Sequence, residues 1–300
     1  MEDLRPNFFV VGAPRAGTTT LYNYLRQHPD IYVPKQKELH YFTREHAASS
    51  YYRPPVIRTE CEYLRHYSAR KGQSLAGDFS PSYLYFETAA EEILRFSSDP
   101  RIIAVLRNPT ERTISHYLMD VAKGLQDKPL SAFYESTAEN SLFHFEYIGA
   151  SLYADGVARY RRLFGPDRVH VIVSEELWAN AESTIVDLLR FLGADPNAPF
   201  RPAGPANTYF EPRAGVPRSF GRSPLARATF RLLPDPLQFA LKTLLRRQGG
   251  RKPEFAAERQ YLYRCFADEV GQLSAILGRD MAGVWSRERL AGERGRRGSP

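Results

Sequence analysis

Residues 12–20 have the types and spacing of a phosphate-binding turn. They read GAPRAGTTT and lie between an apolar run and an expected helix, a place where backbone N–H groups bind phosphate oxygens. Gly12 and Gly17 have the spacing of the triphosphate loop GxxxxGK[ST], but Thr18 replaces its lysine. The second glycine of the dinucleotide fingerprint GxGxxG is also missing. The segment predicts a phosphate site and disfavours NTP hydrolysis and NAD binding; a turn without a ligand would not explain Arg15 beside three threonines.

A second phosphate site is expected where Arg107 ends the apolar run RIIAVLR. Open α/β sheets bind ligands at the carboxyl ends of their strands. Ser115 follows eight positions later, about two helical turns on, and can converge on the same phosphate. The alternatives are a buried ion pair for Arg107 and an ordinary helix position for Ser115. Phosphate sites at two strand ends imply a doubly phosphorylated nucleotide.

A third polar segment, residues 34–42, reads PKQKELHYF and follows the expected first helix. If this segment is extended, residues two apart share a face, so Glu38 and His40 point the same way. A carboxylate and an imidazole can both accept a proton from a reacting group. Glu38 and His40 are therefore both candidates for a general base.

These residues border strand-like and helix-like runs that alternate along the chain. The strand-like runs are residues 8–13, 101–107 and 168–177, and the helical runs are residues 18–29, 108–124, 153–164, 181–193 and about 258–277. The last helix presents its apolar side chains at helical spacing, at Leu262, Phe266, Val270, Leu273 and Leu277. The alternation predicts an α/β fold, a P-loop-type doubly wound sheet with central parallel strands flanked by helices, plus a basic loop-rich cap.

Composition indicates a folded protein whose basic charge is concentrated in one part. The 300 residues are 43% hydrophobic and 25% charged, and the net charge is +7. Residues 201–260 hold twelve Lys and Arg against four Asp and Glu, with eight of the 22 prolines. We expect one domain over residues 1–285, containing a basic, Pro-rich insert at 201–257, and a disordered tail at 286–300.

No apolar run reaches the ~20 residues of a membrane-spanning helix, and no leader pattern opens the sequence. These features predict a cytoplasmic protein. Cys61 and Cys265 are far apart and match neither a zinc spacing nor a redox pair. We expect no metal site.

Six segments together resemble the PAPS-dependent sulfotransferases, especially the heparan sulfate branch and its bacterial relatives. They are GAPRAGTTTLYNYL, PKQKELHYF, GDFSPSYLY, RIIAVLRNPTERTISHYL, YADGVARYRRLFGPDRVHVIVSEEL and YRCFADEVGQLSAILGRDMAGVW, in that order. The resemblance extends over nearly the whole chain to Trp285. It implies the donor 3′-phosphoadenosine 5′-phosphosulfate (PAPS), the product adenosine 3′,5′-bisphosphate, and no metal.

The resemblance also implies roles for individual residues. The 5′-phosphosulfate loop comprises Arg15, Ala16, Gly17, Thr18, Thr19 and Thr20. Arg107 and Ser115 bind the 3′-phosphate, and Arg218 in PRS, with Arg213 second, lies in a loop over the nucleotide. Glu38 is the acceptor's general base, with His40 as the alternative. Arg15, with Lys37 as a second donor, stabilises the bridging oxygen as the nucleotide leaves.

The segment GDFSPSYLY departs from its family counterpart, because Phe79 stands where the heparan sulfate enzymes carry lysine. Phenylalanine suits a less charged acceptor, so we expect a carbohydrate, lipid-linked or natural-product hydroxyl, or an amine. Asp78 is expected to contact the acceptor or to orient an arginine. Glu176 and Trp285 are expected to be a strand-end cap and a core anchor.

The basic insert contains PLQFALKTLLRRQGGRK, at residues 236–252, a pattern that can lie on an anionic membrane surface or pack on its own domain. No nucleic-acid recognition motif accompanies the basic charge. Two other function classes remain open at this point. One is a P-loop kinase or NTPase, and the other is a non-catalytic nucleotide-binding module.

Overall fold

The computed structural model describes residues 4–49, 56–201, 210–212, 246–248 and 253–286, which fall into two compact units. The first unit is built from Met1–Asn108, Leu152–Ala206 and Phe266–Pro300, and the second from Pro109–Ser151 and Asn207–Cys265. Most of the predicted insert, including Arg213, Arg218 and nearly all of residues 236–252, lies outside the described residues. The same holds for residues 287–300 of the tail.

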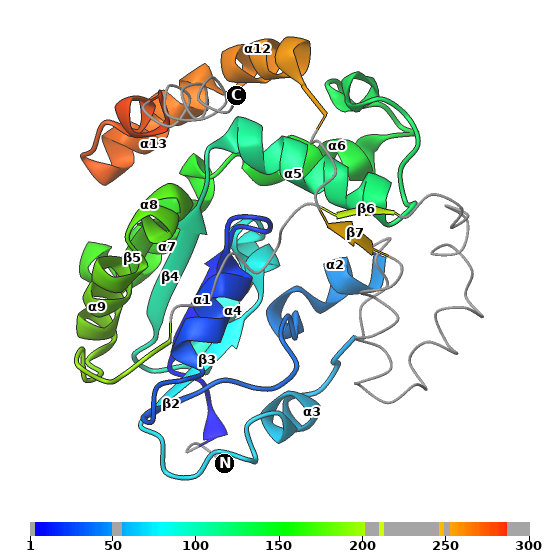
Figure 1. Ribbon diagram of the computed structural model, residues 1–300. Helices are drawn as coiled ribbons and strands as arrows, with labels where there is room; N and C mark the ends of the chain where they lie inside the picture. Colours follow the sequence, from blue (N-terminus) through cyan, green and yellow to red (C-terminus); the bar gives the residue numbers. More distant parts are fainter. Residues whose placement is uncertain (1–3, 50–55, 202–209, 213–245, 249–252, 287–300) are drawn as a thin grey trace. The chain divides into compact units, whose positions relative to one another are not determined.

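The first unit contains a five-stranded sheet in the order β2-β3-β1-β4-β5. Every neighbouring pair is parallel (Figure 1). The strands are β1 (Phe8–Gly12), β2 (Ile31–Tyr32), β3 (Leu75–Phe79), β4 (Arg101–Leu106) and β5 (Val169–Val173). All five residues of β1 are buried, as expected of a central strand covered on both faces. The prediction of a doubly wound parallel sheet is confirmed.

Helices of the first unit follow each strand and carry the site segments. They are α1 (Thr18–Leu25), α2 (Arg44–Ser49), α3 (Glu60–Arg65), α4 (Glu87–Phe96), α7 (Ala154–Phe164), α8 (Ser174–Ala179), α9 (Ala181–Leu192) and α13 (Ala267–Leu277). The short 3₁₀ helices are η2 (Tyr41–Thr43), η3 (Pro81–Leu84) and η6 (Pro166–Arg168). Helix α9 starts where the Asn180 side chain accepts the Ser183 N–H and ends at left-handed Gly193, as predicted.

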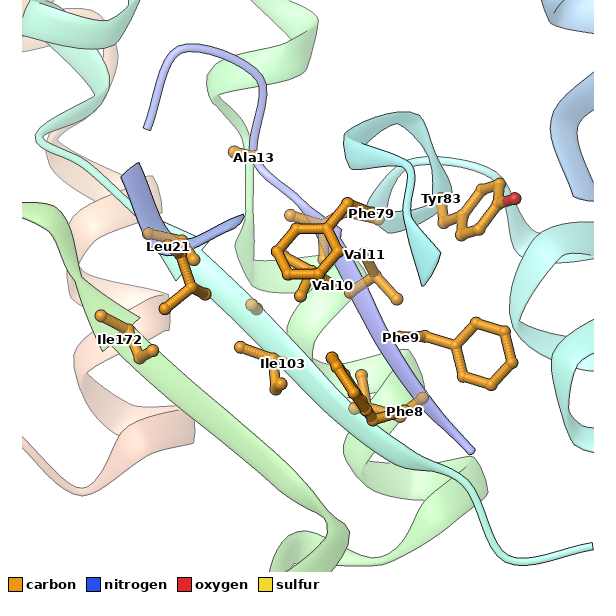
Figure 2. Packing of buried hydrophobic residues seen from close by; sticks show 14 of the residues in the cluster. Phe8, Phe9, Val10, Val11, Ala13, Leu21, Phe79, Tyr83, Ile103 and Ile172 are labelled. Carbon is orange, nitrogen blue, oxygen red and sulfur yellow. The ribbon is translucent and has the colours of Figure 1, made fainter. Parts of the chain in front are cut away.

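The core of the first unit lies between the sheet and its helices (Figure 2). Phe8 and Phe79 are in edge-to-face contact at a centroid distance of 6.2 Å. Gly77 lies opposite Phe8 in the sheet, and a Cβ there would come within 2.1 Å of the Phe8 ring. Glycine is therefore needed at position 77 to let the aromatic ring cross the strand.

A second glycine, Gly156, lies so close to a neighbouring backbone that a substitution there should change stability. A Cβ on Gly156 of α7 would lie 2.5 Å from the backbone oxygen of Leu84, which cannot rotate away. We expect Gly156→Ala to lower the free energy of unfolding by ~1–3 kcal/mol. Gly271→Ala is the matched control, because Gly271 lies in α13 with nothing within 4 Å of the added methyl. Alanine favours the helical conformation more than glycine, so this variant should be stabilised by ~0.5–1 kcal/mol. Urea unfolding of both variants checks the pair, and equal effects would contradict the clash.

The second unit is mainly helical. It contains α5 (Pro109–Ala122), η4 (Leu130–Phe133), α6 (Ser141–Tyr147), η5 (Gly149–Ser151), α12 (Ala256–Cys265) and the antiparallel pair β6 (Phe210–Pro212) and β7 (Arg246–Gln248). Helix α5 begins at Pro109, as predicted. Fully buried Arg112 joins α5 to α6 and η5, because its guanidinium donates to the backbone oxygens of Glu146 and Ala150.

The Glu146 carboxyl of α6 makes the stability of the second unit depend on pH. Burial, together with Asp120 and against the opposing effect of Arg112, raises its pKa from 4.5 to about 7. The folded protein therefore binds this proton more tightly than the unfolded chain, so stability falls as pH rises from about 4.5 to 7 and is flat above. We compare the free energy of unfolding of Glu146→Gln with that of wild type. The difference should favour the variant by up to ~3 kcal/mol more at pH 8 than at pH 4.5.

Urea unfolding of the Glu146→Gln variant at the two pH values measures this difference. Glu139→Gln is the control, because Glu139 is an exposed glutamate of the same unit. A stability difference between Glu146→Gln and wild type that does not change with pH would show that Glu146 titrates alike in the folded and unfolded chains.

Two expected elements differ in the structure. The final helix is not continuous over residues 258–277, because α12 ends at Cys265 and α13 begins at Ala267. The apolar spacing runs across this break, with Leu262, Phe266 and Leu273 all buried, so periodicity alone did not reveal it. Strand β5 ends at Val173 rather than continuing to residue 177. Helix α8 begins at Ser174, whose hydroxyl donates to the Leu106 backbone oxygen at 2.9 Å.

Within the described residues, none of the helices is long and apolar enough to cross a bilayer.

Candidate functional site

The predicted phosphate turn joins β1 to α1 at the carboxyl end of the central strand. Gly17 is the N-cap of α1 with a φ of 97°, a left-handed conformation that glycine adopts without strain. The Ala13 N–H donates to the Val105 backbone oxygen at 2.6 Å, and the Ala16 N–H donates to the Ala13 oxygen at 3.2 Å. The turn is thereby pinned to β4, and the first turn of α1 presents its free N–H groups beside it.

The ammonium that the turn lacks in its own sequence is supplied by Lys37. Its Nζ donates to Oγ1 of Thr18 at 3.1 Å and to Oγ1 of Thr19 at 3.2 Å. Thr18 itself is 4% exposed. Thr20 is also buried. A cation therefore stands at the N-terminus of α1, although it belongs to a segment nineteen positions away from Thr18.

Arg107 follows β4, and its Nη1 donates to the Arg15 backbone oxygen at 3.3 Å. Its Nε is buried without a hydrogen-bond partner. Among the described residues this guanidinium forms no ion pair, although the buried Glu175 carboxylate is near enough to interact with it electrostatically. A half-buried cation with an unpaired N–H beside a phosphate turn is suited to an anionic ligand.

The backbone after Arg107 is held by a buried carboxylate that sequence reasoning missed. Glu175 accepts the Asn108 N–H at 3.0 Å and the Trp285 indole N–H at 3.2 Å. Burial is the main cause that raises the pKa of Glu175. Trp285 is 4% exposed and is a core anchor, as expected. The neighbouring Glu176 instead forms an ion pair with Arg279.

The structure does not test whether two further predicted site residues meet this group. Ser115 lies on α5, in the second unit, so its convergence with Arg107 stays a prediction. Arg218 lies outside the described residues, and its role stays a prediction as well.

The segment with Glu38 and His40 is not extended, so that expectation is wrong. Both residues have left-handed backbone, with φ of 65° and 53°. Such a conformation costs a non-glycine residue ~1–3 kcal/mol and persists only where the surroundings impose it. The Glu38 N–H donates to the Phe79 backbone oxygen at 3.0 Å, and the His40 N–H donates to Ser80 Oγ at 3.1 Å. The end of β3 therefore imposes the strained conformation.

The Glu38 carboxylate faces the phosphate turn through Lys37. Its Oε1 accepts from Lys37 Nζ at 2.7 Å, and the Glu38 side chain is 47% exposed against 15% for Lys37. One ammonium thus joins a solvent-accessible carboxylate to the Thr18 and Thr19 hydroxyls. Glu38 is placed to meet a molecule from solvent while its partner touches the turn.

The His40 ring is more enclosed. Its Nδ1 lies 2.8 Å from Ser82 Oγ, which lies 2.8 Å from Thr43 Oγ1. Burial lowers the His40 pKa below its ordinary value of 6.5, and the nearby Glu38 opposes this shift less strongly. The imidazole is therefore neutral at pH 7. Its position next to Ser82 is suited to orienting the segment.

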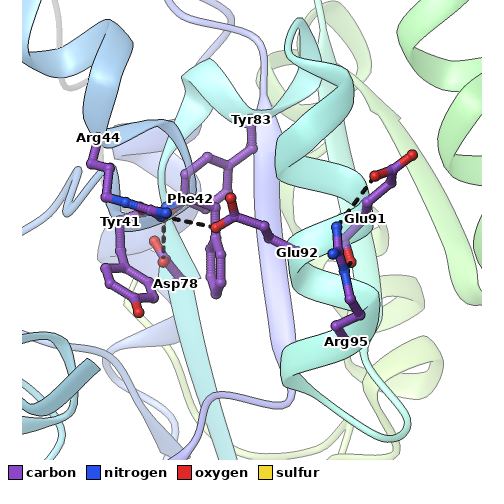
Figure 3. A network of polar contacts seen from close by, with 8 residues as sticks. All are labelled: Tyr41, Phe42, Arg44, Asp78, Tyr83, Glu91, Glu92 and Arg95. Carbon is purple, nitrogen blue, oxygen red and sulfur yellow. Dashed lines mark hydrogen bonds and ion pairs between the residues drawn. The ribbon is translucent and has the colours of Figure 1, made fainter. Parts of the chain in front are cut away.

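Asp78 supports this segment and contacts neither an acceptor surface nor an arginine, which corrects the expectation for it. The carboxylate is fully buried and accepts hydroxyl hydrogen bonds from Tyr63, Tyr83 and Ser80 at 2.6, 2.9 and 2.6 Å. Figure 3 shows the Tyr83 contact. Burial raises the pKa of Asp78. Through Ser80, the network reaches the His40 N–H.

Around Asp78, other polar pairs lie on the surface of the unit. Arg44 Nη1 contacts Glu92 Oε2 at 2.9 Å and donates to the Tyr41 backbone oxygen at 3.1 Å. This pair and the Glu91–Arg95 pair belong to α2 and α4 rather than to the site (Figure 3).

Phe79 is a core residue and carries no information about the acceptor. Its side chain is 3% exposed and packs edge-to-face on Phe8 and on Tyr22, at centroid distances of 6.2 and 5.4 Å. The inference of a less charged acceptor from Phe79 therefore has no support in the structure. The end of β3 contributes its backbone oxygen to Glu38 instead of a side chain to a ligand.

Comparison with known proteins gives consistent matches. The model of a family described as "Sulfotransferase family" matches residues 6–197. Membrane-associated sulfotransferase kil1 of Dictyostelium discoideum is 30% identical over 161 residues, which are 53% of this chain and 32% of that protein. Heparan sulfate glucosamine 3-O-sulfotransferase 6 of Homo sapiens is 27% identical over 191 residues, 63% of this chain and 52% of that protein. The chain thus spans about half or less of the length of these curated relatives.

A solved structure matches over almost the full length. The crystal structure of a sulfotransferase from Alicyclobacillus acidocaldarius superposes with a TM-score of 0.68 at 26% identity. The match covers 94% of this chain and 99% of that one.

Proposed function

This chain belongs to the sulfotransferase family, and we propose that it transfers the sulfuryl group of PAPS to a hydroxyl or amine of an acceptor. The observation that carries the proposal is Arg107, a cation with a buried, unpaired Nε and no ion pair in the described part of the chain. It stands beside the phosphate turn, at the strand end where a 3′-phosphate is expected. A nucleotide with phosphates at both ends of its ribose fits these two neighbouring anion sites.

The 5′ end of the donor would lie on the turn. The N–H groups at the start of α1, residues 17–20, and the hydroxyls of Thr18 and Thr19 would bind its phosphate oxygens. The cations of Arg15 and Lys37 would stabilise the bridging oxygen that gains negative charge as the nucleotide leaves. Ser115 and Arg218 are proposed to add contacts to the 3′-phosphate.

Glu38 is proposed to be the general base. Its carboxylate would take the proton of the acceptor hydroxyl or amine while the acceptor atom bonds to sulfur. The bond from sulfur to the bridging oxygen breaks, and adenosine 3′,5′-bisphosphate leaves with that electron pair. His40, neutral and bonded to Ser82, is proposed to orient this segment, with the role of base as its alternative.

The acceptor class rests on the relatives. The names of the mammalian relatives specify a glucosamine of heparan sulfate. We propose a carbohydrate, lipid-linked or natural-product acceptor. Screening such acceptors for PAPS-dependent sulfation tests this part separately from donor binding.

Calorimetric titration with adenosine 3′,5′-bisphosphate and with ADP tests the donor site. We expect wild type to prefer the bisphosphate by about 100-fold, equivalent to about 2.7 kcal/mol. Arg107→Ala should remove most of this preference, because it deletes the proposed 3′-phosphate ligand. Arg190→Ala is the control, since Arg190 is an exposed, ion-paired arginine on α9. Equal binding of both nucleotides by wild type, or Mg²⁺-dependent ATP turnover, would favour a kinase or NTPase instead.

A further inference from the structure

Trp178 is an exposed aromatic residue that lies between the two proposed anion sites. It belongs to α8 and is 40% exposed. The Arg107 Cζ lies 4.9 Å from the centroid of its ring. Gly17 lies near the same indole, because a Cβ added to Gly17 would be 3.7 Å from the indole Nε1. The indole therefore contacts the arginine at the end of β4 and lies near Gly17, the residue before α1.

The contact with Trp178 is one of two direct contacts of the Arg107 guanidinium among the described residues, in addition to the electrostatic attraction of the Glu175 carboxylate. The other is the single, long hydrogen bond from Nη1 to the Arg15 oxygen. A guanidinium binds phosphate well only when its planar fork faces the oxygens. One hydrogen bond still allows the guanidinium to rotate about the axis of that bond. The flat face of the indole therefore restricts the orientation of the guanidinium plane.

The position of Trp178 is itself supported by contacts at the start of its own helix. Ser174, one helical turn earlier, donates to the Leu106 backbone oxygen, and Glu175 holds the Asn108 N–H. Both contacts tie the start of α8 to the end of β4, which carries Arg107. The indole and the guanidinium are thus fixed to the same strand end, and a shift of one relative to the other is restricted.

We infer that Trp178 is a positioning residue that sets the selectivity of the donor site for a 3′-phosphate, by holding the Arg107 guanidinium in the plane that binds it. The inference rests on the proposed function, because it takes a nucleotide 3′-phosphate as the ligand of Arg107. Trp178 acts through Arg107. Its removal should therefore change discrimination between nucleotides more than it changes affinity for a nucleotide without a 3′-phosphate.

The test compares binding of adenosine 3′,5′-bisphosphate and ADP to wild type, Trp178→Leu, Trp178→Phe, Arg107→Ala and the Trp178→Leu/Arg107→Ala double variant. We expect Trp178→Leu to lower the preference for the bisphosphate by roughly 5- to 30-fold, the size of a partly desolvated cation–π contact. ADP affinity should be nearly unchanged. Trp178→Phe should restore part of the preference, and the double variant should lose no more than Arg107→Ala alone.

Intrinsic fluorescence supplies an independent readout, because Trp178 and Trp285 are the two tryptophans of the chain and Trp285 is buried. Bisphosphate binding should change the emission of wild type and leave that of Trp178→Phe nearly constant. Leu94→Ala is the matched control for truncating an exposed hydrophobic side chain, since Leu94 is 42% exposed on α4. It should alter neither nucleotide preference nor emission.

The outcomes separate this inference from the proposed function. If wild type prefers the bisphosphate and Trp178→Leu keeps that preference, the positioning role is wrong and the proposed function stands. If Trp178→Leu weakens both nucleotides equally, Trp178 contacts a part of the nucleotide that they share, which also overturns the inference. If wild type shows no preference, the proposed function fails first.

Discussion

Glu38→Gln is expected to lower kcat for sulfuryl transfer by about 10²–10⁴-fold, the usual contribution of a general base. Glutamine keeps the size of the side chain and can still accept from Lys37 Nζ, but it cannot take a proton. Affinity for adenosine 3′,5′-bisphosphate should therefore stay within about twofold of wild type, since the expected loss belongs to the transition state. Steady-state kinetics with PAPS, combined with calorimetry, measures both quantities.

Glu91→Gln provides a matched control for this experiment. Glu91 is 52% exposed in its side chain and ion-paired at 3.2 Å with Arg95, much as Glu38 is 47% exposed and paired with Lys37. Its replacement should leave kcat unchanged. His40→Gln tests the alternative base. If His40→Gln lowered kcat by about 10²–10⁴-fold while Glu38→Gln kept wild-type kcat, the proton transfer would be assigned to His40.

Lys37→Met is expected to lower kcat by about 10²–10³-fold, as for loss of one preorganised donor to a developing charge. Methionine keeps the length of the stem and removes the ammonium that contacts Thr18, Thr19 and Glu38. The reason is that, in the proposed function, the bridging oxygen of PAPS gains negative charge near this ammonium only as its bond to sulfur breaks. Single-turnover kinetics at saturating PAPS isolates this step.

Lys35→Met is the control for Lys37→Met, because Lys35 belongs to the same segment and is exposed. It should retain wild-type turnover. If Lys37→Met raised KM for PAPS without changing kcat, the ammonium would bind the donor equally in the ground state and the transition state. It would then not assist the departure of the nucleotide.

The phosphate turn and its strands could be predicted because their signals are local. A buried run that ends in glycine and is followed by a helix start gave β1, the turn and α1 in the right places. Arg107 was likewise found from its position at the end of an apolar run. In such segments the neighbouring residues determine the backbone conformation, so the local sequence is sufficient to predict it.

The geometry around Glu38 could not be predicted, because it is imposed from outside the segment. The left-handed backbone at Glu38 and His40 depends on acceptors at Phe79 and Ser80, about forty positions later. An extended conformation was the reasonable expectation for residues 34–42 taken alone. The signal that could have helped is the run SPS after β3, which offers hydroxyls to a neighbouring segment.

Trp178 and Asp78 were missed or misassigned for a related reason. Trp178 meets Arg107 only because β5 lies next to β4 and α8 starts directly at Ser174. Asp78 is buried because tyrosines from α3 and η3 both donate to it. A strand-end carboxylate looks the same in sequence whether it faces a ligand or two tyrosines.

The first unit cannot be completed until its last segment has been synthesised. Its segments are separated by parts of the second unit, and Trp285, in the last segment, donates to Glu175, which holds the Asn108 N–H next to Arg107. Glu269 of α13 likewise accepts the N–H groups of Tyr153 and Ala154 at the start of α7. At ~5–20 residues per second on a ribosome, the turn, β4 and Arg107 emerge roughly ten seconds or more before these partners. A nascent chain therefore holds Arg107 on an unfinished support until Glu269 and Trp285 are synthesised.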